Sequence, residues 1–150
     1  MGALEAVFYP QLRNFVVEQE INEGRKRIDI VADNGQSKGF FGDLSSLHGI
    51  FCPYVLIECK NYTKDIENPE LDQLTGRFSN RRGQFGIMAC RSIRDKDWVV
   101  KSARDILNSG RGCIVVLEDA DLIQMLEYRR TENYDAISNH MGLKLREVVF

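Results

Sequence analysis

The chain has 150 residues, of which 43% are hydrophobic and 28% charged, and its net charge is −2. These values suit one soluble globular domain with one core, and they do not by themselves indicate a nucleic-acid-binding protein, which would here need a local basic surface. No apolar run approaches the roughly 18 residues that cross a bilayer, and the N-terminus lacks the regions of a secretory signal. We therefore expect a cytoplasmic protein with no membrane partner; a domain cut from a longer chain is equally compatible.

The first third of the chain predicts a helix followed by an antiparallel hairpin. Apolar residues of the first dozen follow helical spacing, although Pro10 interrupts it. Residues 15–21 alternate as a strand, Asn22-Glu23-Gly24 is a turn signal, and residues 25–32 form the second strand. Within the second strand, one face carries Ile28, Ile30 and Ala32, and the other carries Arg27, Asp29 and Val31.

The remainder alternates between strand and helix patterns. Residues 33–49 favour a loop with a short helical turn near 44–48. Asn68 is the expected cap of a helix that Arg81-Arg82-Gly83 ends, and the last twenty residues leave helix and irregular chain open. The other predicted elements are strands at 54–60, 85–90 and 113–117 and helices at 95–108 and from Asp119. This order predicts an α/β fold, a single-domain α/β sandwich around a central mixed sheet, with the later strand-helix-strand units parallel.

The strand Tyr54-Val55-Leu56-Ile57-Glu58-Cys59-Lys60 carries the strongest chemical signal. Side chains alternate along a strand, so Glu58 and Lys60 point the same way. Burying a carboxylate and an ammonium costs several kcal/mol unless each finds a partner. A divalent cation on the carboxylate, with a phosphate or a water beside the ammonium, would supply those partners.

If the 25–32 strand pairs with this one, Asp29 joins Glu58 and Lys60 on one face. The chain resembles the PD-(D/E)XK nuclease superfamily, also called restriction-endonuclease-like, in two motifs. Lys26-Arg27-Ile28-Asp29-Ile30 is followed about thirty residues later by Ile57-Glu58-Cys59-Lys60-Asn61. The element order agrees with this fold from about Leu4 to about Tyr128.

The resemblance implies metal-dependent cleavage of phosphodiester bonds. Asp29 and Glu58 would hold Mg²⁺, with Mn²⁺ able to substitute, helped by the backbone carbonyl of Cys59. Lys60 would orient the attacking water and offset negative charge in the transition state. The implied partner is DNA rather than RNA, in bacterial restriction or anti-phage defence. A homodimer is reasonable, because one active site cuts one strand at a time, and a regulatory domain or subunit is compatible.

Further residues are weaker candidates. Members of the superfamily often place another acid ahead of the Asp; Glu20 is our choice, against an exposed acid on a strand face. Gln73 lies on the next helix, where some branches carry a Gln that contacts the site, followed four residues later by Tyr. Here that position is Arg77, for which a phosphate contact and a solvated surface arginine both stay open. A basic rim around the cleft could come from Arg25, Lys26, Arg27, Lys38, Lys64, Arg81 and Arg82.

Alternatives to the nuclease interpretation remain. Asp29 and Lys60 could form a structural salt bridge, or the fold could serve as a non-catalytic DNA-binding or assembly module. A phosphoesterase acting on RNA or a small nucleotide would favour a deep closed pocket, whereas an open groove lined by Arg and Lys would favour a polymer. The four cysteines form no Cys-x-x-Cys pair and are expected to be reduced and buried, while His48 and His140 are expected to be structural.

Overall fold

The computed structural model describes residues 2–60 and 65–150. Their elements are α1 (Gly2–Phe8), β1 (Arg13–Ile21), β2 (Lys26–Asp33), α2 (Gly39–Ser46), β3 (Tyr54–Lys60), α3 (Asn68–Thr75), β4 (Phe85–Cys90), α4 (Lys96–Asn108), β5 (Cys113–Glu118), α5 (Asp119–Arg130) and α6 (Tyr134–Val149). The strands form one sheet in the order β1-β2-β3-β4-β5. The pairs β1-β2 and β2-β3 are antiparallel, and β3, β4 and β5 are parallel, which confirms the predicted α/β sandwich with a mixed sheet.

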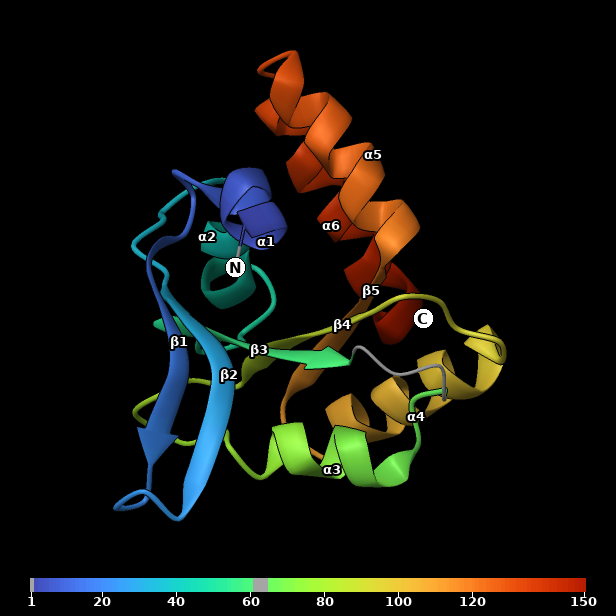
Figure 1. Cartoon of the computed structure of the whole chain (residues 1–150). Helices are drawn as coiled ribbons and strands as arrows, with labels where there is room; N and C mark the ends of the chain where they lie inside the picture. The colour runs from blue at the N-terminus through green and yellow to red at the C-terminus, as the bar shows by residue number, and fades with distance from the viewer. Residues whose placement is uncertain (1, 61–64) are drawn as a thin grey trace.

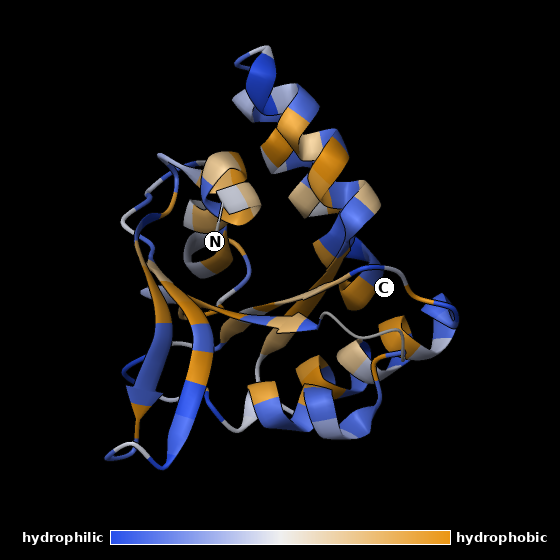
Figure 2. Cartoon of the chain, viewed as in Figure 1, coloured by the Kyte–Doolittle hydropathy of each residue, from blue (hydrophilic) through white to orange (hydrophobic). Residues whose placement is uncertain are grey.

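Helices cover both faces of the sheet (Figure 1). On one face, α1, α2, α5 and α6 build the larger core, in which Phe8, Phe41 and Phe85 are fully or almost fully buried. On the other face, α3 and α4 pack through Leu71, Leu74 and residues of α4. Every residue of β4 is buried, because this strand is interior, between β3 and β5, and covered on both sides. Figure 2 shows the apolar colour concentrated on the sheet and on the helix faces turned toward it.

The hairpin of β1 and β2 extends past the rest of the sheet. β2 pairs with β3 only from Ile30, opposite Ile57, to Asp33, opposite Tyr54. Its pairing with β1 continues much further, to Lys26 opposite Ile21. Residues 18–29, which we call the hairpin arm, therefore project beyond β3, and Figure 1 shows them descending beside α3.

Two helices differ from expectation at their ends. The N-cap of α3 is Glu67 rather than Asn68, since Glu67 and Glu70 form a reciprocal capping box. This helix also ends at Thr75, well before residues 81–83, and the chain turns at Gly76. The ambiguous C-terminal segment is a full helix, α6, because Ile137, Met141, Leu145 and Val148 make a buried stripe at helical spacing.

The cysteines match the prediction of reduced, mostly buried thiols. All four are free, and only Cys59 is partly exposed. Burial raises the pKa of the thiols of Cys52, Cys90 and Cys113 to about 12, so they are inert small apolar groups at neutral pH. Among the described residues, no helix combines the length and apolar character needed to span a membrane.

Candidate active site

A polar cleft of about 520 Å³ lies between the hairpin arm and α3, at the C-terminal end of β3. The arm lines it with Asp29 and three basic residues, and β3 lines it with Glu58, Cys59 and Lys60. Asp29 and the Glu-x-Lys pair thus come together from two strands, as the alternation of side chains predicted. The cleft opens on the α3 side of the sheet.

Asp29 stands where β2 and β3 part. Beyond the pair Ile30–Ile57 the two strands no longer form a regular ladder. There the backbone N–H of Cys59 donates to Asp29 Oδ2 at 2.9 Å. This bond from main chain to carboxylate fixes Asp29 beside Glu58 at the head of the cleft.

Glu58 is buried in an unfavourable place for a charge, with only 4% of its surface exposed. Burial raises the pKa of the Glu58 carboxyl above its ordinary value, and the negative charge of Asp29 raises it further. The positive charge of Arg77 opposes both effects without cancelling them. The two carboxylates therefore form a site that a cation would stabilise.

Arg77 is the residue whose setting the sequence did not reveal. It is 7% exposed, and its Nη1 donates to Glu58 Oε1 in a buried ion pair. Because α3 ends at Thr75, Arg77 lies in the following turn, where its N–H donates to Leu74 O at 3.0 Å. Of the two roles left open for Arg77, that of a solvated surface arginine is wrong, and Arg77 does not lie on α3 with Gln73. No spacing rule links an arginine in a turn to a strand glutamate nineteen positions away.

The other candidates divide between the cleft and its surroundings. Gln73 lines the cleft from α3, as do Arg25 and Arg27 from the arm. Arg27 also forms an exposed ion pair with Glu18 at 3.4 Å. Glu20 does not line the cleft: it is exposed, and its carboxylate lies near Gly24 at the hairpin turn. The structure therefore does not bring Glu20 to Asp29 and Glu58.

The expected basic rim is narrower than proposed from the sequence. Arg81 is exposed and Arg82 donates from Nε to Arg77 O at 2.8 Å, but neither lines the cleft. Lys38 precedes α2, which packs on the opposite face of the sheet. Lys64 lies outside the described residues. The basic residues of the arm, Arg25, Lys26 and Arg27, are thus the part of the rim that borders the cleft.

The oxygen donors of the cleft suit Mg²⁺. The described residues contain no group of three or more His, Cys, Asp or Glu side chains that could hold a metal. Two carboxylates and the main-chain carbonyl of Cys59 are, however, the modest oxygen set that Mg²⁺ accepts, since it usually keeps several waters. Asp29 and Lys60 do not form the structural salt bridge considered above; the ion pair found there is that of Glu58 with Arg77.

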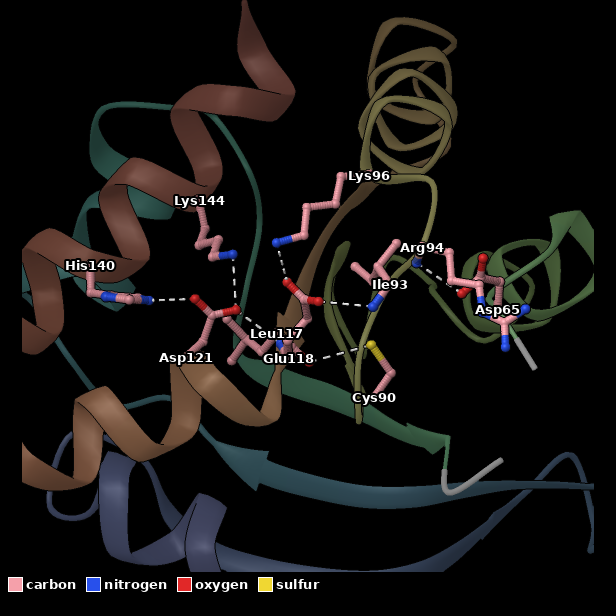
Figure 3. Close-up of polar contacts among 10 residues, drawn as sticks. All are labelled: Asp65, Cys90, Ile93, Arg94, Lys96, Leu117, Glu118, Asp121, His140 and Lys144. Carbon is pink, nitrogen blue, oxygen red and sulfur yellow. Dashed lines mark hydrogen bonds and ion pairs between the residues drawn. The ribbon is translucent and has the colours of Figure 1, made fainter. Parts of the chain in front are cut away.

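A second polar cluster lies at the end of β5 (Figure 3). Asp121 accepts from the N–H of Glu118, from Lys144 and from His140, and Glu118 accepts from the N–H of Ile93 at 2.8 Å. Burial alone would raise the pKa of Asp121, but these hydrogen bonds hold it below its ordinary value. The cluster joins α5 to α6 and to the segment before α4. It includes His140, whose Nε2 lies 2.8 Å from Asp121 Oδ1.

Comparison with known proteins found one similar solved structure. No protein-family model matches it, and no curated protein matches it either. Among solved structures it is similar to a chain of the MspJI restriction endonuclease in complex with a 27-mer oligonucleotide. The TM-score is 0.48 and the identity 14%, over 97% of this chain and 29% of that one.

Proposed function

We propose that the chain is a Mg²⁺-dependent nuclease that hydrolyses phosphodiester bonds in DNA. One observation carries the proposal: Asp29, Glu58 and Lys60, distant in sequence, line one polar cleft on one face of the sheet. A buried Glu with a raised pKa beside a second carboxylate is costly for a metal-free fold. Such a cost is typical of a site kept for chemistry rather than stability.

Each residue has a separate task in this proposal. Asp29 and Glu58, with the Cys59 carbonyl, would hold the metal, which when bound polarises the phosphate and lowers the pKa of a water. Lys60 lies two residues beyond Glu58 on β3 and lines the same cleft. There it would hold the attacking water and offset the charge that develops on the phosphate oxygens. Gln73 would position substrate from the α3 side.

A polymer substrate is favoured over a small nucleotide by the lining of the cleft. Its polar surface and its row of basic residues, Arg25 to Arg27, border an arm that stands out from the sheet. Phosphates along a nucleic-acid backbone bind such rows through many weak ionic contacts. The local basic surface also reconciles DNA binding with the net charge of −2. A restriction or anti-phage role is the biological setting we propose for this activity.

The ion pair of Glu58 with Arg77 favours a second candidate, a DNA-binding module without catalysis. In that case the guanidinium would permanently provide the positive charge that a nuclease takes from its metal. The retained Asp29 and Lys60 in the same cleft weigh against it, because a non-catalytic module would need neither.

Cleavage of plasmid DNA tests the nuclease proposal. We expect supercoiled plasmid to be nicked or linearised with Mg²⁺ or Mn²⁺ and to stay intact with a chelator. Asp29→Ala, Glu58→Ala and Lys60→Ala should each reduce the cutting rate by about a hundredfold or more, as loss of a charge-stabilising group usually does. Lys101→Ala, an exposed change on α4, is the matched control for the loss of a lysine. Unchanged cutting by Lys60→Ala would contradict the assigned mechanism.

A further inference from the structure

We propose that Arg77 is a built-in counterion that occupies Glu58 in the metal-free protein and is displaced when a divalent cation binds. The arginine would thereby set how much metal the cleft needs before it is loaded. This inference rests on the proposed function, because it assumes that Glu58 is a metal ligand. It assigns to Arg77 a role in metal loading that the resemblance does not supply.

Burial and charge make Arg77 and a metal ion competitors for one carboxylate. Glu58 and Arg77 are both nearly inaccessible to solvent, with side-chain exposures of 5% and 8%. The negative charge of Asp29 also acts on Glu58, while the Arg77 guanidinium is paired with Glu58 alone. A divalent cation on Glu58 would lie against this guanidinium, and like charges at such range repel strongly in a poorly solvated site. Both cations cannot keep the present contacts.

The geometry of the Arg77–Glu58 contact would allow a metal ion to replace it. Arginine locked into a structural pair commonly engages a carboxylate through two parallel N–H bonds. Here the bond to Glu58 runs from Nη1 alone, and Arg77 Nε is buried without any partner in the described part of the chain. A buried donor left unpaired costs free energy, so this arrangement is not the best that the guanidinium could have. Arg77 also lines the cleft, which gives it a place to move.

The position of Arg77 in the chain fits a movable group. It follows the last turn of α3 and is held by main-chain bonds, from its N–H to Leu74 O and from Arg82 Nε to its own carbonyl. These bonds anchor the backbone and leave the side chain joined only to Glu58 among the described residues. A change of rotamer would therefore release Glu58 without moving α3.

Metal binding in the absence of DNA tests the proposal directly. Isothermal titration of the full chain with Mn²⁺ and with Mg²⁺ is compared for the wild type, Arg77→Met and Arg77→Lys. If Arg77 competes with the metal, Arg77→Met should bind it more tightly by on the order of tenfold, within the usual range for coupled sites. Arg77→Lys keeps the charge and should stay closer to the wild type. Arg130→Met removes an exposed arginine that pairs with Glu127 on α5 and should change nothing.

The possible results separate this inference from the nuclease proposal. If the wild type binds metal and Arg77→Met binds it equally well or more weakly, the counterion role is overturned and the nuclease proposal stands. Binding by Arg77→Met alone supports the counterion role and moves the wild type to the non-catalytic candidate. Binding by neither protein overturns both proposals.

A measurement on the wild type covers the case in which Arg77→Met fails to fold. The side-chain Nε–H signal of Arg77, assigned by its absence in Arg77→Lys, is followed by NMR during a titration with Mg²⁺. We expect this buried N–H to shift and to exchange faster with water as metal binds. A signal that stays unchanged while calorimetry shows saturation of the site would overturn the proposal.

Discussion

Glu58 is a single residue that lowers the stability of the metal-free fold. Its carboxyl group is buried, faces the charge of Asp29 and has one guanidinium for compensation. A carboxyl group with a raised pKa contributes stability below its unfolded pKa, and that contribution is lost as the pH rises through the folded pKa. Metal-free stability should therefore decline from the ordinary Glu value of 4.5 upward.

Asp29→Asn should reduce this decline. The amide keeps an oxygen that can accept from the Cys59 N–H but removes the charge that raises the pKa of Glu58. At pH 7 we expect the metal-free variant to be more stable than the wild type, with a smaller gain near pH 4.5. Urea unfolding across this pH range measures the difference, with Asp105→Asn on α4 as the control. A variant less stable than the wild type at pH 7 would contradict this explanation of the cost of the site.

For single residues, the sequence predicted the strand face of a side chain better than it predicted the contacts of that side chain. Asp29, Glu58 and Lys60 share a face because strands alternate, and that rule needs only the order of residues. Glu20 lies opposite Arg27 on the arm, but it belongs to the outer strand β1, and its carboxylate lies near Gly24 rather than in the cleft. Arg77 obeys no local rule, since its burial depends on where α3 stops.

Among the elements, the turn between α3 and β4 determines the wall of the cleft. Leu71, Leu74 and Phe78 follow helical spacing, which is why the sequence predicted a longer helix. Phe78 instead packs from the turn against Gly86 and Gly112, whose missing side chains leave room for its ring. Packing against these two glycines overrode the local helical pattern, whereas the strands and α4 followed theirs.

Gly112→Ala should be one of the more damaging small changes in the chain. At φ +127° a side chain is strained, and the added methyl would overlap the Phe78 ring and lie 3.0 Å from Gln84 O. We expect a loss of about 2 kcal/mol or more beyond that of Gly110→Ala, which meets the strain at φ +74° but has no neighbour within 4 Å. Urea unfolding of both variants measures the gap. Equal losses would show that Phe78 does not need this space.

The whole molecule separates its stabilising core from its charged cleft. The larger core lies with α1, α2, α5 and α6 on one side of the sheet, while the cleft lies on the α3 side. The sequence could predict the two-sided sheet, because the order of strands and helices fixes it. It could not predict the reach of the hairpin arm, which depends on β2 pairing with β1 for longer than with β3.

The arm should dominate the DNA binding proposed for this chain. Replacing Arg25, Lys26 and Arg27 together by Gln should weaken binding about equally for different sequences. It should also make the slope of log K against log salt shallower by about 0.9 for each phosphate that the arm no longer neutralises. Replacing Lys101, Arg130 and Arg146, which lie on α4, α5 and α6, removes the same charge elsewhere and is the control. Titration of fluorescent duplex DNA in Ca²⁺ at several salt concentrations measures the affinity and the salt slope of each variant. Equal slopes for the arm variant and the wild type would exclude the arm as the DNA-binding surface.

The alternation of β2 also limits how this chain can diverge. Ile30, next to Asp29, belongs to the core that contains Phe41 and Phe85. Ile28 instead packs into the core on the α3 side, so the prediction that it shares a face with Ile30 and Ala32 is wrong. Inserting one residue between Asp29 and the Ile30–Asp33 ladder with β3 would turn the acid toward the core that contains Phe41 and Phe85. Changes of length there are therefore acceptable only two residues at a time, whereas the tip at residues 22–25 can lengthen by any number. Related sequences can therefore differ in the length of the arm at its tip while Asp29 keeps its position.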